Sequence, residues 1–270
     1  MIIDFHTHIF PDAIAEATVS AIEEGAKTMR YADGTARGLI AAMDRAGVDL
    51  AVNLPVLTRA RQFAHVAAFA EEVNARSYPT ARILSFGGVH PDDPEAPDRV
   101  DELADRGFLG IKIHPDYQNT FFDDEAYLRI MARAKARGLI TVTHAGVDAA
   151  YVRGVIHCTP DRVLRALDRL GGYDRLVLAH IGGEQFSTEV LATLCGEAIY
   201  FDTAYSLHEM PRERFLEILD THGDERILFA TDSPWRDAGE ELAILRGHGI
   251  PEASLSRILG ENAKKLLGLV

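Results

Sequence analysis

Short runs of apolar and β-branched residues recur along the chain, and amphipathic stretches separate them. The runs lack strict alternation of apolar and polar positions, which is typical of strands in a parallel sheet that is covered on both faces. They predict strands over 2–6, 49–54, 81–87, 109–114, 139–144, 175–180, 198–202 and 226–231.

The stretches between these runs carry the spacing of helices. Phe63, Val66, Ala70 and Val73 recur near a period of 3.6 residues and predict a helix over 59–76. The same spacing predicts helices over 124–137, 236–247 and 251–267. Gly138 stands where a glycine commonly ends a helix.

The alternation of strand and helix from end to end predicts an α/β fold, a (β/α)8 TIM barrel. An open doubly wound sheet is the competing fold, but it normally has a glycine-rich phosphate loop after its first strand, and here histidines follow instead. No low-complexity linker divides the chain. We therefore expect residues 1–270 to form a single domain.

Composition and charge argue against several classes of protein. A chain of 270 residues with 47% hydrophobic content builds a large core without disulfides. The net charge of −13 argues against binding to nucleic acid or anionic lipid. Charged residues interrupt every long apolar stretch, and the first residues lack the features of a signal peptide. With only Cys158 and Cys195, the sequence favours a cytoplasmic protein without membrane contact.

The histidines at the predicted strand ends are the main chemical signal. His6 and His8 form an HxH pair at the end of the first strand, where residues two apart point to one face. Taken alone, this pair fits two polar residues at a strand exit as well as two metal ligands. His114, His144 and His180 end the fourth, fifth and sixth strands.

Asp232 follows the eighth strand, so it completes a set placed at one rim of the barrel, where active sites of this fold collect. The other histidines are expected to be less informative. We expect His65, His222 and His248 to face solvent from helices or helix ends; His157 and His208 lie in loops, and His90 is a pocket candidate.

These motifs together resemble the amidohydrolase superfamily, in particular its amidohydrolase-related branch of metal-dependent hydrolases and some non-oxidative decarboxylases. The resemblance spans residues 2–268. It rests on HTH (6–8), GIKIHP (110–115), THAG (143–146), AHIGG (179–183), TDSPW (231–235) and GENAKKLLG (260–268).

The resemblance implies metal ligands at His6, His8, His144 and Asp232. Zn²⁺ suits such nitrogen and oxygen ligands best, and Mn²⁺, Fe²⁺ or Co²⁺ fit the same set. A divalent ion lowers the pKa of a bound water toward about 7. Asp232 is then expected to accept the proton of that water.

His180 matches the additional histidine of the family, which is a proton-transfer residue in mononuclear members and a second ligand in binuclear ones. We expect the catalytic pair to be Asp232 and His180, and we favour a mononuclear site. Lys112 stands where the family carries a bridging carboxylated lysine or glutamate. Binding of an anionic substrate group ranks first for Lys112, and a bridge in a binuclear site ranks second.

Further residues are substrate-binding candidates. His114 lies two residues beyond Lys112, so both side chains can face the barrel interior. Trp235 either lines the pocket or packs in the core, and Arg236 either binds a substrate carboxylate or begins a helix. Tyr205 is a pocket-lining candidate, and the segment 25–38 is a long insertion able to cover the rim.

Three functions follow from this pattern. The first is a metal-dependent hydrolase that acts on an amide, ester or lactone bond of a small substrate, which can be carboxylated. The second is a decarboxylase or hydratase of an unsaturated or aromatic acid on the same metal. The third is a non-catalytic, metal-containing binding barrel. The expected partner is a small molecule, and the sequence is compatible with a homodimer.

Overall fold

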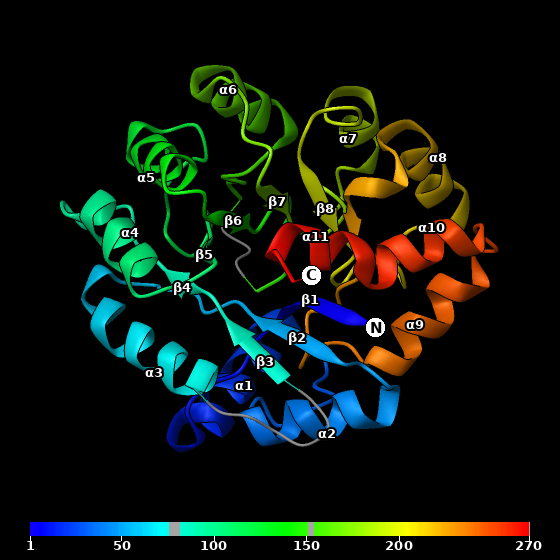
Figure 1. The fold of residues 1–270 in the computed structure, drawn as a ribbon, viewed down its shortest axis with the longest axis horizontal. Helices are drawn as coiled ribbons and strands as arrows, with labels where there is room; N and C mark the ends of the chain where they lie inside the picture. The colour runs from blue at the N-terminus through cyan, green and yellow to red at the C-terminus, as the bar shows by residue number, and fades with distance from the viewer. Residues whose placement is uncertain (76–81, 151–153, 270) are drawn as a thin grey trace.

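A ring of helices surrounds a barrel of short parallel strands in a computed structural model that describes residues 1–75, 82–150 and 154–269 (Figure 1). The strands are β1 (Ile3–Thr7), β2 (Leu50–Asn53), β3 (Arg82–Ser85), β4 (Gly87–Gly88), β5 (Gly110–Ile113), β6 (Ile140–Thr143), β7 (Leu176–Leu178), β8 (Tyr200–Asp202) and β9 (Ile227–Leu228). The helices around them are α1 (Asp12–Ala26), α2 (Ala36–Ala46), α3 (Phe63–Ala75), α4 (Ala96–Asp105), α5 (Glu125–Ala136), α6 (Pro160–Leu170), α7 (Ser187–Thr193), α8 (Arg212–His222) and α9 (Ala238–Gly247).

The strand pairing closes into the predicted barrel. Strands pair in parallel in the orders β1-β2-β3 and β4-β5-β6-β7-β8-β9. Since β3 and β4 follow each other directly and pair with β2 and β5, they act as one barrel strand broken at Phe86. The amide of Phe5 donates to the carbonyl of Phe229 at 2.9 Å, which joins β1 to the residue that directly follows β9. The (β/α)8 prediction is confirmed.

Buried side chains form two apolar layers. One lies inside the barrel and includes Phe5, Phe86, Val142 and Leu228, and the other lies between the strands and the outer helices. The chain ends in α10 (Glu252–Ser256), the π-helical turn η3 (Arg257–Glu261) and α11 (Asn262–Leu267). Residues of α11 belong to the inner layer, and α11 crosses the end of the barrel beside the N-terminus (Figure 1). The polar C-terminal ends of the strands lie at the opposite end of the barrel.

The structure refines several predicted boundaries. The expected helix 59–76 begins as a 3-10 turn, η1 (Ala60–Gln62), and continues as α3, and its predicted last residue is outside the described residues. The expected helix 251–267 is interrupted by η3. In the segment 25–38, only residues 27–35 form a loop, because α1 ends at Ala26 and α2 begins at Ala36. None of the described helices has both the length and the apolar character needed to cross a bilayer.

The expectation that His222 and His248 face solvent is wrong, because both side chains are buried. The ring of His222 stacks on Phe201 with centroids 4.0 Å apart. Its Nε2 donates to the carbonyl of Ile199 at 3.1 Å, and its Nδ1 accepts from the amide of Gly196 at 3.3 Å. Helix periodicity did not reveal this, since the covering groups come from the neighbouring strand and loop.

The buried His222 predicts a loss of stability in acid. Burial lowers its pKa to about 4, so between pH 6.5 and pH 4 the unfolded chain binds a proton that the folded chain does not. As the pH is lowered from 6.5 to 4, the free energy of unfolding should therefore decrease, and His222 should account for up to about 3 kcal/mol of this decrease. Urea unfolding of the His222→Gln variant should show a smaller fall, whereas His65→Gln, which alters an exposed histidine, should match the wild type. Equal pH slopes in all three proteins would contradict this.

Candidate metal centre

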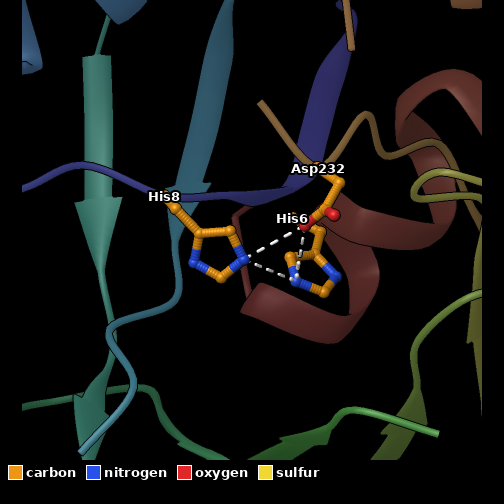
Figure 2. A group of neighbouring side chains, drawn as sticks. All are labelled: His6, His8 and Asp232. Carbon is orange, nitrogen blue, oxygen red and sulfur yellow. Dashed lines mark hydrogen bonds and ion pairs between the residues drawn. The ribbon is translucent and has the colours of Figure 1, made fainter. Parts of the chain in front are cut away.

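Three predicted ligands meet at the C-terminal end of the barrel, shown in Figure 2. His6 and His8 come from β1 and the loop after it, and Asp232 comes from the loop after β9. The Nε2 atoms of the two histidines are 3.2 Å apart. Oδ1 of Asp232 is 3.1 Å from Nε2 of His8 and 3.4 Å from Nε2 of His6. The structure thus gathers three ligand atoms from opposite ends of the chain around one point.

Local structure brings these side chains together. The register between β1 and β2 shifts between Asp4 and Thr7, so the pairing is irregular where His6 stands. The amide of Asp232 donates to the carbonyl of His6 at 2.9 Å, and the amide of His8 donates to the carbonyl of Ser233 at 2.6 Å. Asp232 also has a left-handed backbone with φ of 68°. Such a conformation costs a non-glycine residue about 1–3 kcal/mol and is concentrated at functional sites.

Hydrogen bonds on the far side of each ring set the tautomers. Nδ1 of His8 is 2.9 Å from the carbonyl oxygen of Leu54, which can only accept, so Nδ1 carries the proton. Nδ1 of His6 is 2.9 Å from a carboxylate oxygen of Asp202, at the end of β8. The neutral tautomer that these partners select has an unprotonated Nε2 directed toward Asp232 in each ring. Partners of this kind orient metal-binding histidines in proteins.

A cation fits this arrangement. Two imidazole lone pairs and a carboxylate oxygen face one another at 3.1–3.4 Å, and acceptors at such distances repel unless a proton or a cation lies between them. The donor set of two nitrogens and one oxygen matches Zn²⁺ and the other first-row divalent ions. His6, His8 and Asp232 are accordingly residues able to hold a metal.

Burial and neighbouring charges shift the pKa values of the groups around this point. Lys112 on β5 is 1% exposed, and its Nζ lies 3.2 Å from Nε2 of His6. Burial lowers the pKa of Lys112 to about 8, and burial together with Lys112 holds the pKa of His6 well below its ordinary value. Burial alone would raise the pKa of Asp232, but its contacts with the neighbouring histidines lower it. The site therefore favours a neutral His6 and an ionised Asp232.

His144 and His180 lie beside this group. Nδ1 of His144 is 3.0 Å from Nε2 of His180, and Nδ1 of His180 is 2.8 Å from the carbonyl oxygen of Ala204. The rings of His6 and His180 have centroids 5.6 Å apart. His144 is not among the ligand atoms that gather within 4.8 Å around His6, so its role as a ligand stays a prediction.

His114 belongs to the same row of rings. It stacks on His144 with centroids 4.4 Å apart and on Tyr117 at 4.1 Å. Nε2 of His114 is 3.1 Å from Oδ2 of Asp148. His114, His144 and Asp148 form a second group whose ligand atoms lie within 4.8 Å of one another. The polar rim thus extends from β1 across β5 and β6.

The remaining predicted residues have other surroundings. Trp235 is buried. The guanidinium of Arg236 has three protein partners: Glu241 at 2.7 Å, Glu240 at 3.3 Å and the hydroxyl of Tyr31 at 3.4 Å. Binding of substrate by Trp235 and Arg236 stays a prediction, and for Arg236 these partners compete with it.

Two segments that the sequence singled out meet over the rim. The hydroxyl of Thr28 is 3.1 Å from that of Tyr205, and the amide of Tyr31 donates to the carbonyl of Pro234 at 2.7 Å. The loop 27–35 therefore contacts the loops after β8 and β9. His90 and His157 are buried, and His208 is half-buried.

Sequence reasoning missed the carboxylates that support the histidines. Asp202 binds His6, Asp116 binds His157 at 2.6 Å, and Asp148 binds His114. Asp202 ends a predicted strand, so the rule that selected the histidines was able to find it. Asp116 and Asp148 lie in loops, where strand ends offer no such signal.

The comparisons with known proteins agree with the fold. The family model described as Amidohydrolase matches residues 3–269. The chain therefore belongs to the amidohydrolase family, whose members are enzymes. No curated protein matches the sequence.

Solved structures share the barrel at low identity. A 2,6-dihydroxybenzoate decarboxylase from Rhizobium is 18% identical with a TM-score of 0.71, and the match covers 99% of this chain and 98% of that one. A 5-carboxyvanillate decarboxylase from Novosphingobium aromaticivorans, complexed with manganese and a nitrobenzoic acid, is 16% identical with a TM-score of 0.71, covering 100% and 96%. A Pseudomonas putida protein proposed to be a 2-pyrone-4,6-dicarboxylic acid hydrolase is 16% identical with a TM-score of 0.65, covering 99% and 97%. At these identities the likeness establishes the fold.

Proposed function

We propose that this chain is a metal-dependent hydrolase that cleaves an amide, ester or lactone bond of a small, carboxylated substrate. The observation that carries the proposal is the convergence of Nε2 of His6, Nε2 of His8 and Oδ1 of Asp232 on one point. His6, His8 and Asp232 would hold the ion, with His144 as the further ligand. Zn²⁺ is the metal we favour, and one ion is favoured over two.

The chain supplies the proton-transfer groups. A bound divalent ion contributes Lewis-acid chemistry, which polarises a carbonyl and acidifies water. Asp232 would hold the ion through Oδ1, which faces His6 and His8, and its other oxygen would be able to hold a proton. His180 donates from Nδ1 to Ala204, so the atom of this ring that can accept a proton is Nε2, which lies 3.0 Å from Nδ1 of His144. These properties suit Asp232 and His180 for general acid and base roles.

Cationic and polar groups beside the centre suit an anionic substrate. The ammonium of Lys112 lies within the rim at 3.2 Å from His6, and His114 lies beside His144. We assign Lys112 to a carboxylate of the substrate and His114 to its orientation. A small carboxylated molecule is thus the proposed partner.

A second candidate is non-oxidative decarboxylation on the same metal. The observation that favours it is that the similar structures include two decarboxylases of aromatic acids, one of them with bound manganese. The proposed hydrolase from Pseudomonas putida favours the first candidate. Both reactions need the same ligands, so product analysis has to distinguish them.

The test is metal analysis followed by product analysis. Elemental analysis and anomalous scattering should find a divalent ion at His6, His8 and Asp232. A panel of lactones, esters, amides and hydroxylated benzoic acids in ¹⁸O-water should then yield labelled product for hydrolysis, whereas release of CO₂ without label would establish decarboxylation. A protein without metal at this site, after purification with Zn²⁺ or Mn²⁺, would overturn the proposal.

A further inference from the structure

Two buried atoms face each other beside the candidate metal centre. Nε2 of His144 and Oδ2 of Asp116 are 3.8 Å apart, and neither has a hydrogen-bond partner among the described residues. Their residues are 5% and 2% exposed, so both atoms lie away from the protein surface. Leaving a buried polar group without a hydrogen bond destabilises the folded protein. A donor and an acceptor so close predict that the pair forms in another state of the site.

The tautomer of His144 decides whether this pair can form. Nδ1 of His180 donates to Ala204, so Nε2 of His180 carries a lone pair toward Nδ1 of His144. If Nδ1 of His144 bears the proton, it donates to His180, and a bare Nε2 then faces the carboxylate of Asp116. If Nε2 bears the proton, it faces Asp116 correctly, but two lone pairs then meet at 3.0 Å between His144 and His180.

A cation at Nδ1 of His144 removes this conflict, because it takes the place of the proton there. We infer that Asp116 is a positioning residue for His144: it accepts the Nε2 proton and holds the ring with Nδ1 available to the metal. Binding of the ion moves the imidazole proton from Nδ1 to Nε2 without changing the charge of His144. The inference rests on the proposed metal site and extends it.

Two hydrogen bonds from His157 fix the position of the Asp116 side chain. Its Oδ1 accepts from Nδ1 of His157 at 2.6 Å and from the amide of His157 at 3.0 Å. Both bonds use Oδ1 and leave Oδ2 directed to His144. A shift of about 1 Å would bring the 3.8 Å separation to hydrogen-bonding distance. In carboxylate–histidine–metal arrangements of this type, replacing the carboxylate typically weakens metal binding by about 10–100-fold.

A control aspartate is available outside the candidate metal groups. Asp220 is exposed on α8 and belongs to neither group of candidate ligands. A general effect of removing one negative charge from the chain would appear in both variants. An effect through the tautomer of His144 requires Asp116 alone.

The test measures Zn²⁺ affinity of the full chain by competition with a chelator. The Asp116→Asn variant should bind Zn²⁺ about 10–100-fold more weakly, because the amide cannot match the carboxylate as acceptor. The Asp220→Asn variant should keep the wild-type affinity. Equal affinities for wild type and Asp116→Asn, or equal losses in the two variants, would overturn the inference.

A second measurement does not depend on a variant that folds. In ¹⁵N-labelled wild type, long-range ¹H–¹⁵N spectra should show the proton of His144 on Nδ1 without metal and on Nε2 with Zn²⁺. A proton that stays on Nδ1 after Zn²⁺ binds would overturn the role of Asp116 and leave the metal site standing. Failure of wild type to bind Zn²⁺ or Mn²⁺ at all would instead overturn the proposed function, and this inference with it.

Discussion

Replacement of Asp232 by Asn is expected to lower kcat/KM by about 10²–10⁴-fold, the range for loss of a general acid or base. The side chain is the only carboxylate in the group with His6 and His8, and its pKa is held below the ordinary value, so it is ionised at neutral pH. An amide cannot take up the proton that the proposed mechanism transfers. The effect should fall on kcat more than on KM, because Asp232 acts on protons and Lys112 binds the substrate.

The measurement uses whichever substrate the product screen identifies, with unfolding curves to verify the fold. Asp220→Asn is the matched control, since Asp220 is an exposed aspartate on α8. It should keep wild-type kinetics. Retention of full turnover by Asp232→Asn would exclude both the hydrolase and the decarboxylase proposals, and retention of ligand binding by a wild type without turnover would favour the binding barrel.

Replacement of His8 by Ala is expected to abolish the stabilisation that metal gives the protein. A ligand at 1,000 times its Kd raises the free energy of unfolding by about 4 kcal/mol. Removing one of three converging ligand atoms should reduce affinity enough that the same Zn²⁺ concentration has little effect. The side chain of His8 is only part-buried, so the substitution should leave the core intact.

Unfolding in guanidinium with Zn²⁺ or with EDTA measures the difference. His65→Ala removes an exposed histidine from α3 and should keep the full difference between the two conditions. An equal Zn²⁺-dependent gain in His8→Ala would show that the ion binds elsewhere, for example at His114, His144 and Asp148.

The order of elements was predictable because hydrophobic periodicity is local. Runs such as 109–114 and 139–144 correspond to β5 and β6 within a residue or so at each end. The break between β3 and β4, the π-helical turn η3 and the burial of His222 were not predictable in this way. Each depends on packing against a segment distant in the sequence.

The candidate site, like the fold, was predictable from the sequence only in part. Parallel strands in a barrel bring their C-terminal ends to one rim, so the sequence by itself determined that His6, His8, His144, His180 and Asp232 lie there. Family membership, which the motifs predicted, is confirmed.

Only the tertiary structure decided what these residues can do. The tautomers of His6 and His8 follow from Asp202 and from the carbonyl of Leu54, which lie on other strands. The left-handed backbone of Asp232 and the approach of Asp116 to His144 depend on loops. Strand ends are placed by short-range periodicity, but protons are placed by contacts within about 3 Å between distant segments, which a linear pattern does not encode.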